Sequence, residues 1–252
     1  MNIKIVTYNI HKGFSIGGQF TLHEMRDALA ALKPDVILLQ EVVGENRRHQ
    51  KKIPTWPTEA QHEFVSSVFG FHAVYGKNAV FPIRHHGNAI LSRFPIRNWE
   101  NINISNNRWE QRGLLHAILE IDRQPLHIFN VHLDLTELGR QRQLKRILTR
   151  GTEHVPHHEA LIVAGDMNDW GKKFSSPLLE NLDLRESYSH LHGKHAATFP
   201  SFRPLLQLDR FYSRHLRIHH AQVLREKPWP GLSDHLPLYF ELELSAATGK
   251  SL

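Results

Sequence analysis

Acids, amides, histidines and an arginine recur in this sequence where short apolar runs end. The clearest case is the run at 161–163, which Gly165 ends and after which Asp166 and Asn168 project to the same side. Strands that repeatedly deliver such side chains indicate one cleft at an edge of the sheets. The residues collected in this way are Asn9, Glu41, Arg112, His132, Asp166, Asn168, Asp209, Asp234 and His235.

The residue types in this set predict chemistry on a phosphate ester. Carboxylate and amide oxygens in a chain without cysteine suit a hard cation such as Mg²⁺ or Mn²⁺. The forked donors of Arg112 suit an anionic oxygen. A histidine beside carboxylates suits proton transfer or a hydrogen bond to a developing charge. Together they indicate metal-assisted attack of water on a phosphate ester.

The first part of the chain predicts a strand–helix–strand unit. Residues 3–10 and 35–41 have the pattern of buried strands, and each ends near a residue of the polar set. Between them, apolar residues recur at helical spacing over 22–32, and Thr21 and Glu24 fit an N-terminal capping box. A strand, a helix and a second strand predict a crossover in a mixed or parallel sheet.

Further elements follow from the same patterns along the rest of the chain. Residues 44–57 are polar and basic and are predicted to form an exposed loop, after which Thr58 with Gln61 would cap a helix. We expect one domain over residues 1–245 and a tail over 246–252. Strands are predicted at 71–75, 87–92, 114–121, 126–133, 208–212, 216–223 and 236–244, and further helices at 137–150 and 177–182.

Composition narrows the class of protein. The 252 residues carry a formal net charge of +6 with a pI near 9.6, which favours polyanionic partners such as nucleic acid, anionic lipid head groups or phosphorylated small molecules. The chain has no cysteine, no signal-peptide pattern and no apolar run long enough to span a bilayer. We therefore expect a cytoplasmic protein without a transmembrane segment, and no obligate protein partner is implied.

Six short motifs carry a resemblance to a known family. They occur in that family's order and span nearly the whole chain: Thr7–Ile10, Leu39–Val42, Gly87–Arg93, Asn130–Leu133, Gly165–Asn168 and Ser233–His235. With them the chain resembles the endonuclease/exonuclease/phosphatase superfamily. The resemblance implies an α/β fold, a four-layer α/β/β/α sandwich of two packed mixed β-sheets with outer helices.

The same resemblance assigns roles around a divalent metal, Mg²⁺ or Mn²⁺. Asn9, Glu41 and Asp234 would hold the ion, with Asp166 close by. Asp166 would orient or deprotonate the attacking water, and Asn168 would fix that water or the phosphate.

It also assigns roles around the phosphate. His132 and His235 would bond the phosphoryl oxygens and stabilise the pentacovalent transition state. Asp209 would orient one of these two histidines, and the sequence does not distinguish which. Arg112 matches a position near the phosphate.

The substrate is left open between several classes. The basic runs at 47–52 and 140–150 favour nucleic acid as the substrate. The first hypothesis is therefore a phosphodiesterase that acts on DNA or RNA. Against it, residues 7–13 lack the Asn-Gly-Leu-Arg continuation of the exonuclease III branch. Residues 87–93 and 233–237 look closer to small bacterial metal-dependent hydrolases with lipid-like relatives. A phospholipid or small phosphoester is therefore the alternative substrate.

One further hypothesis for the function, and the roles of two tryptophans, also stay open. The chain could be an inactive module that binds nucleic acid or a membrane through its basic faces. Trp170 and Trp229, near the central and last motifs, would stack on a base, sit in a lipid interface or pack as rim residues.

Overall fold

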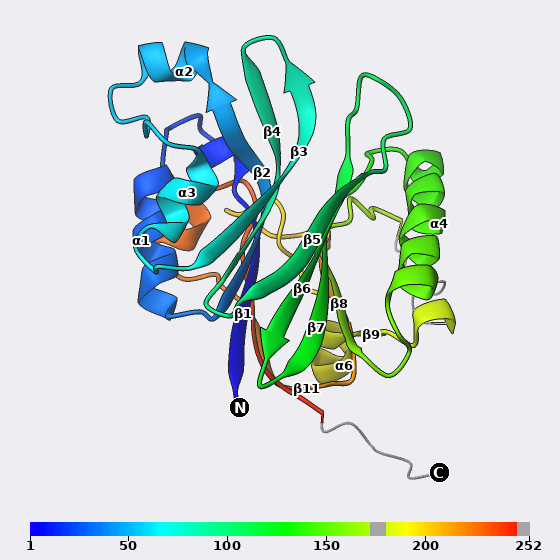
Figure 1. Cartoon of the computed structure of the whole chain (residues 1–252). Helices are drawn as coiled ribbons and strands as arrows, with labels where there is room; N and C mark the ends of the chain where they lie inside the picture. The colour runs from blue at the N-terminus through cyan, green and yellow to red at the C-terminus, as the bar shows by residue number, and fades with distance from the viewer. Residues whose placement is uncertain (172–179, 246–252) are drawn as a thin grey trace, which may run out of the picture.

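Two six-stranded mixed sheets pack face to face in the computed structural model, which describes residues 1–171 and 180–245 (Figure 1). The first sheet has the order β11 (Leu216–Val223), β12 (Leu238–Leu244), β1 (Ile3–Asn9), β2 (Val36–Asn46), β4 (Arg84–Ser92) and β3 (His72–Phe81). The second has the order β5 (Ile96–Asn103), β6 (Gly113–Ile121), β7 (Gln124–His132), β8 (Ala160–Asp166), β10 (Asp209–Arg214) and β9 (Arg185–Glu186).

Each sheet contains one parallel pair of strands. β1 pairs with β2 and β7 pairs with β8 in parallel, and the other pairings between described strands are antiparallel. All seven residues of β8 are buried, as its unbroken apolar run predicts. Because parallel strands carry their C-terminal ends to the same edge, each pair delivers its final residues to one end of the sandwich.

Helices cover the outer faces of the sheets, so the predicted four-layer sandwich is confirmed. On one side lie α1 (Leu22–Leu32) and α3 (Gln61–Ser66), and on the other lies α4 (Glu137–His154) (Figure 1). Leu144 and Ile147 of α4 pack in a separate small core against the second sheet. Further helical segments in the described part of the chain are η1 (His11–Gly13), α2 (Arg47–Lys52), α6 (Ser187–His192) and η2 (Trp229–Gly231), and residues 180–182 are also helical.

Some predicted elements were wrong. Residues 44–57 are not a loop, because β2 continues to Asn46 and a short helix, α2, follows it. Thr21 makes no capping bond; its hydroxyl donates instead to the carbonyl of Leu232 at 2.6 Å. The Thr58 cap is also wrong, since α3 begins after Ala60, whose N–H donates to a side-chain oxygen of Glu63.

Other expectations are not tested. Residues 177–179 of the helix predicted at 177–182 and the tail at 246–252 lie outside the described residues, whereas residues 180–182 are helical. The single domain over 1–245 stays a prediction. Within the described part of the chain, no helix is long and apolar enough to cross a membrane.

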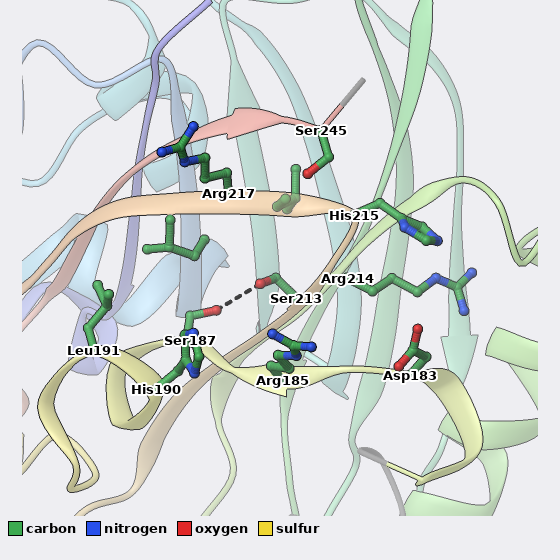
Figure 2. Close-up of a pocket in the computed structure, with 12 residues that line it drawn as sticks. Asp183, Arg185, Ser187, His190, Leu191, Ser213, Arg214, His215, Arg217 and Ser245 are labelled. Carbon is green, nitrogen blue, oxygen red and sulfur yellow. Dashed lines mark hydrogen bonds between the residues drawn. The ribbon is translucent and has the colours of Figure 1, made fainter. Parts of the chain in front are cut away.

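A cavity of about 450 Å³ opens at the far end of β10 (Figure 2). Arg214 lines it, and this residue pairs with Leu161 near the start of β8, at the opposite end from Asp166. The Arg214 guanidinium donates to the carbonyls of Leu182 and Pro156, at 3.0 and 2.9 Å. The guanidinium of Arg214 is therefore occupied by hydrogen bonds to the backbone. The cavity lies apart from the cluster of predicted site residues.

Candidate active site

Strand register brings three of the predicted residues into one row. His132, the last residue of β7, pairs with Asp166 at the end of β8, and Asp166 pairs with Asp209 at the start of β10. All three side chains are buried. Because side chains of directly opposed residues lie close together on a sheet face, the register itself assembles this part of the site.

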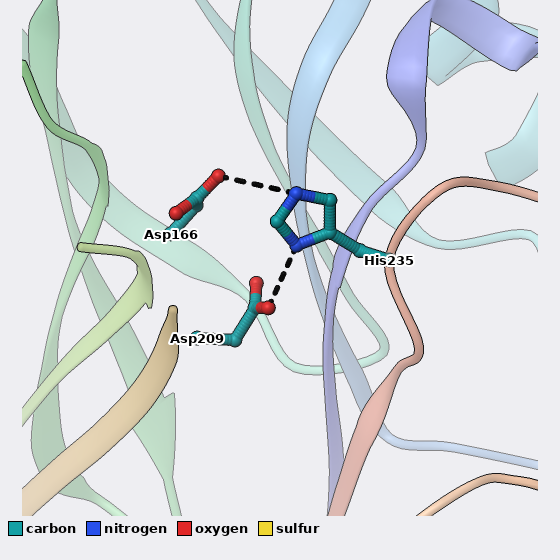
Figure 3. A group of neighbouring side chains, drawn as sticks. All are labelled: Asp166, Asp209 and His235. Carbon is teal, nitrogen blue, oxygen red and sulfur yellow. Dashed lines mark hydrogen bonds and ion pairs between the residues drawn. The ribbon is translucent and has the colours of Figure 1, made fainter. Parts of the chain in front are cut away.

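The ring of His235 lies between two of these carboxylates (Figure 3). Its Nδ1 atom is 2.8 Å from Asp209 Oδ2, and its Nε2 atom is 3.6 Å from Asp166 Oδ2. The Nε2 atom of His132 lies 3.5 Å from the same Asp166 oxygen. Asp209 therefore contacts His235, the alternative that the sequence did not distinguish.

Burial and charge give these groups different protonation states. Burial raises the pKa of Asp166 to about 6, with His235 lowering it and Asp209 raising it. Burial lowers the pKa of His235, but Asp209 and Asp166 outweigh this effect and raise it to about 10. Burial holds the pKa of His132 well below its usual value, and Arg112 lowers it further. At neutral pH the site therefore holds a protonated His235, a neutral His132 and an ionised Asp166.

Asn9, at the end of β1, connects the first sheet to Asp166. Its Nδ2 atom donates to Asp166 Oδ2 at 3.0 Å, and its Oδ1 atom accepts from the His11 N–H at 3.0 Å. The Ser233 hydroxyl donates to the Asn9 carbonyl at 2.8 Å. The loop that carries His235 is thereby anchored to the same strand end.

Glu41 reaches the site through an irregularity in β2. The register between β2 and β4 shifts between Leu39 and Val42, and Glu41 has a positive φ of 56°. Its Oε2 atom lies 2.6 Å from the Lys12 ammonium. Burial would raise the pKa of Glu41, but His132 and Lys12 act against it and the pKa lies below its usual value. Because His132 is neutral, the Lys12 ammonium is the group that holds the pKa of Glu41 down.

Asp234 borders the site from the loop before β12. Its Oδ1 atom lies 3.8 Å from His11 Nδ1, and its side chain is 20% exposed. His11 also acts electrostatically on Glu41, so it lies near both carboxylates. The three predicted metal ligands therefore surround the chain segment that follows Asn9.

Asn168 and Arg112 lie at the margins of the row. The Asn168 N–H donates to Asp166 Oδ1 at 3.0 Å, and its Nδ2 atom donates to the Leu133 carbonyl at 2.9 Å. Arg112 forms a 2.7 Å ion pair with Glu110 and acts on His132 through its charge. All nine residues of the polar set thus connect to one end of the sandwich.

The comparison with known families agrees with this geometry. Residues 6–235 match the endonuclease/exonuclease/phosphatase family. The chain belongs to that family. It is 39% identical to a protein of Escherichia coli strain K12 named "Uncharacterized protein YbhP", over 96% of this chain and 97% of that protein.

Solved structures of the family share the fold. A Beutenbergia cavernae member has a TM-score of 0.77 at 18% identity, covering 98% of this chain and 72% of that one. The human Nocturnin catalytic domain with bound sulfate has a TM-score of 0.73 at 20% identity, covering 97% and 94%. D. rerio TDP2 with a single-strand DNA product has a TM-score of 0.67 at 17% identity, covering 96% and 99%. Members of this family hydrolyse phosphoric esters.

Within the family motifs, several amides have a role that the sequence did not indicate. Gln40 donates to the Asn130 side chain at 2.8 Å, and Asn130 donates to the carbonyls of Leu39 and Ala89. Asn88 donates to the Asn130 carbonyl at 3.3 Å. These contacts join the two sheets directly beneath the site.

Two residues of the site were missed in the sequence. Lys12 pairs with Glu41, and the Thr198 hydroxyl donates to Asp209 Oδ2 at 2.5 Å. Lys12 stands three residues after Asn9 and could have been noted as a charge beside a motif residue. Thr198 belongs to no motif, so only its position in the folded chain reveals it.

Two groups of residues offer ligand atoms for a divalent metal ion. Ligand atoms of Asp166, Asp209 and His235 lie within 4.8 Å of one another. However, His235 Nδ1 is hydrogen-bonded to Asp209 at 2.8 Å and its Nε2 atom lies 3.6 Å from Asp166, so both ring nitrogens already face carboxylates. The oxygen donors of Asn9, Glu41 and Asp234, with Glu41 ionised, fit a hard divalent cation better. His235 is better described as an ion-paired histidine.

Proposed function

We propose that this protein is a divalent-metal-dependent phosphodiesterase. The observation that carries the proposal is the protonated His235 held between Asp209 and Asp166, beside Asn9 and Glu41. Asn9, Glu41 and Asp234 would hold Mg²⁺ or Mn²⁺. When bound, such an ion would supply a positive charge that polarises the phosphoryl group.

Some protein groups act on the attacking water and others on the phosphate. Ionised Asp166 orients the attacking water and accepts its proton, and Asn168 fixes the water or the phosphate. Protonated His235 donates from Nε2 to a phosphoryl oxygen, and neutral His132 offers a second donor. Arg112 adds positive charge at the margin. These donors stabilise the charge that builds on the phosphoryl oxygens in the transition state.

Nucleic acid is the first substrate class. A net charge of +6 and the exposed cations of α2 support it, since a basic surface attracts a phosphate backbone. One structural neighbour is a TDP2 bound to a single-strand DNA product. Against a phosphate-tracking role for the run at 140–150, Arg140 donates to the Leu135 carbonyl and Arg150 forms an ion pair with Glu100.

Phospholipid is the second substrate class, favoured by exposed apolar side chains close to the site. Trp170 follows the Asp166 motif and is 47% exposed, whereas Trp229 is buried and packs edge-on against Tyr8. Phe202 and Leu205 are also exposed, in the segment that carries Thr198. Side chains of this kind suit a lipid interface more than a phosphate backbone.

Hydrolysis of bis-p-nitrophenyl phosphate and p-nitrophenyl phosphate with Mg²⁺ or Mn²⁺ tests the proposal. We expect cleavage of the diester, loss of turnover with EDTA, and loss in Asp166→Asn. Asp122→Asn, at the opposite end of β6, is the matched control and should keep full activity. A panel of DNA, RNA and phospholipid then separates the substrate classes.

If neither soluble compound and no substrate of that panel is hydrolysed, and Asp166→Asn binds ligand as the wild type does, an inactive binding module would be favoured. A cytoplasmic location, which the cysteine-free composition suggests, is part of the proposal.

A further inference from the structure

Large apolar side chains are exposed along one side of the site. They come from the tip of the β3–β4 hairpin, the loop between β5 and β6, and the segment where α4 begins. Their exposed fractions run from 40% for Phe81 to 80% for Trp109. We call this set the apolar rim: Val80, Phe81, Ile83, Trp109, Leu135 and Leu138.

Hydrogen bonds join the three parts of the apolar rim into one surface. The Val80 N–H donates to the Gln111 side chain at 3.1 Å, which ties the hairpin to the β5–β6 loop. The Leu135 N–H donates to Glu110 Oε1 at 3.2 Å, which ties the start of α4 to the same loop. Figure 1 shows the hairpin and this loop rising beyond the sheets at the same end.

The hairpin that carries part of the apolar rim extends past the site. Val42, next to Glu41, pairs with Gly87, and the hairpin continues from there to Arg84 and Phe81. At about 3.3 Å per residue, its tip projects about 10 Å beyond the level of Glu41. Arg112 stands at the base of the β5–β6 loop. A surface that contacts the rim therefore also faces the site.

Positive charge accompanies the apolar rim. α2 lies beside the hairpin, where the Arg47 N–H donates to the Ile83 carbonyl at 3.2 Å. The Arg84 guanidinium lies 4.8 Å from the centre of the Phe81 ring, and that of Arg108 lies 4.5 Å from the Trp109 ring. Exposed cations on these elements are Arg47, Arg48, Lys51, Lys52, Arg84 and Arg108.

The acids on the same elements are fewer. Glu45 pairs with Arg47 at 2.7 Å and Glu110 pairs with Arg112 at 2.7 Å, and Glu137 stands at the start of α4. Glu45 and Glu110 are thus each paired with an arginine, and the cations on this surface outnumber the acids. A positive rim with exposed apolar side chains matches the negative surface and apolar interior of an anionic bilayer.

We propose that the apolar rim and the α2 cations dock onto an anionic phospholipid bilayer and hold the site toward lipid phosphodiesters. This inference rests on the proposed function for the chemistry and adds the surface on which it occurs. Four of the six rim residues are aliphatic, so they offer no ring on which a nucleobase can stack. Aliphatic tips and Trp109 instead insert among lipid head groups while the neighbouring cations contact lipid phosphates.

Co-sedimentation of the full chain with lipid vesicles tests the proposal. We expect binding to vesicles that mix phosphatidylcholine with phosphatidylglycerol, weakened by salt, and little binding to phosphatidylcholine alone. Trp109→Ser and Arg48→Glu should each lower the partition coefficient about fivefold or more. The matched controls are Trp99→Ser, on the middle of β5, and Arg123→Glu, in the β6–β7 turn at the opposite end, and both should bind as the wild type does.

Hydrolysis of soluble bis-p-nitrophenyl phosphate separates docking from catalysis, and every rim variant should retain it. Absence of vesicle binding by the wild type, or equal effects of Trp109→Ser and Trp99→Ser, would overturn the proposal. If the wild type binds no vesicles and the rim variants lose binding to single-stranded DNA, the proposal is overturned in favour of a nucleic-acid surface. Vesicle binding by a protein that cleaves no diester would support the docking surface and remove the proposed activity.

Discussion

His235 Nδ1 and Asp209 Oδ2 lie 2.8 Å apart, and this hydrogen bond fixes the orientation of the buried imidazole. Thr198 donates to the same carboxylate oxygen at 2.5 Å. The ring of Phe199, next to Thr198, lies 4.9 Å from that of His235. A segment outside every family motif therefore positions a motif histidine.

Replacing Asp209 by Asn should lower kcat about 100-fold with a small change in KM. The amide removes the negative charge that keeps His235 protonated, and it weakens the acceptor to which the Nδ1–H donates. Steady-state kinetics on a diester measures the effect.

Thr198→Val is the matched variant for this position. It keeps the Asp209 charge and removes only the hydroxyl donor, so kcat should fall about tenfold, the scale of one hydrogen bond to a charged group. Equal losses in the two variants, with the fold intact by circular dichroism, would contradict the orienting role of Asp209.

Glu41→Gln should weaken binding of Mg²⁺ or Mn²⁺ by more than about tenfold, because a neutral amide replaces the ionised carboxylate that would ligate the cation. Calorimetric titration of the folded protein with Mn²⁺ measures this directly. Removal of metal with EDTA should abolish diester cleavage in the wild type.

Lys12→Met should change metal affinity in the opposite direction. Lys12 lies 2.6 Å from Glu41 Oε2 and competes with a cation for that oxygen. The variant should therefore bind Mn²⁺ several-fold more tightly, and its activity should reach half-maximum at lower metal concentration. Weaker binding would show that Lys12 supports the site rather than competing with the ion.

These contrasts show what the sequence could and could not reveal. Patterns at strand ends identified His132, Asp166 and Asp209, and the register of the three strands places them in one row. Thr198 could not be found, since its contact depends on the path of an irregular segment. Gln40 was recognised only as part of a motif, because its partner Asn130 lies in the other sheet.

The errors in secondary structure have equally physical causes. β5 was not predicted, because its residues are mostly exposed and it is held by pairing with β6 rather than by an apolar pattern. Thr21 fitted a capping box by sequence, but a tertiary acceptor, the Leu232 carbonyl, takes its hydroxyl. Local patterns thus failed where a long-range partner decided the outcome.

A buried histidine pair beneath α4 predicts acid sensitivity of the fold. Arg150 Nε donates to His116 Nδ1 at 3.1 Å, so His116 Nε2 carries the proton and donates to His127 Nδ1 at 2.9 Å. His127 Nε2 then donates to Glu159 at 2.6 Å. Each nitrogen is satisfied only while both rings are neutral.

Stability should therefore fall as pH drops below about 6.5, the unfolded-state pKa of histidine. Burial lowers the pKa of His116 to about 3 and lowers that of His127 as well, so the unfolded chain binds more protons in this range. The expected loss is about 1 kcal/mol per pH unit. Urea unfolding between pH 7 and about 5 measures it.

His127→Gln should be less stable at pH 7 and should show a flatter pH dependence. Its matched control is His157→Gln, on an exposed position, which should follow the wild-type curve. If both variants keep the same slope, other groups cause the acid loss.

Gly165→Ala should destabilise the protein by at least about 3 kcal/mol, because the strand before Asp166 has no room for a side chain. Gly165 has a φ of 131°, and a Cβ atom there would lie 2.0 Å from the Val131 carbonyl oxygen of β7. Gly70→Ala is the matched control: it also has a positive φ, 65°, but nothing lies within 4 Å of its Cβ. It should cost only the backbone strain, about 1 kcal/mol. Urea denaturation compares the two, and equal losses would mean that strain, rather than the close approach of β7, makes glycine necessary beside Asp166.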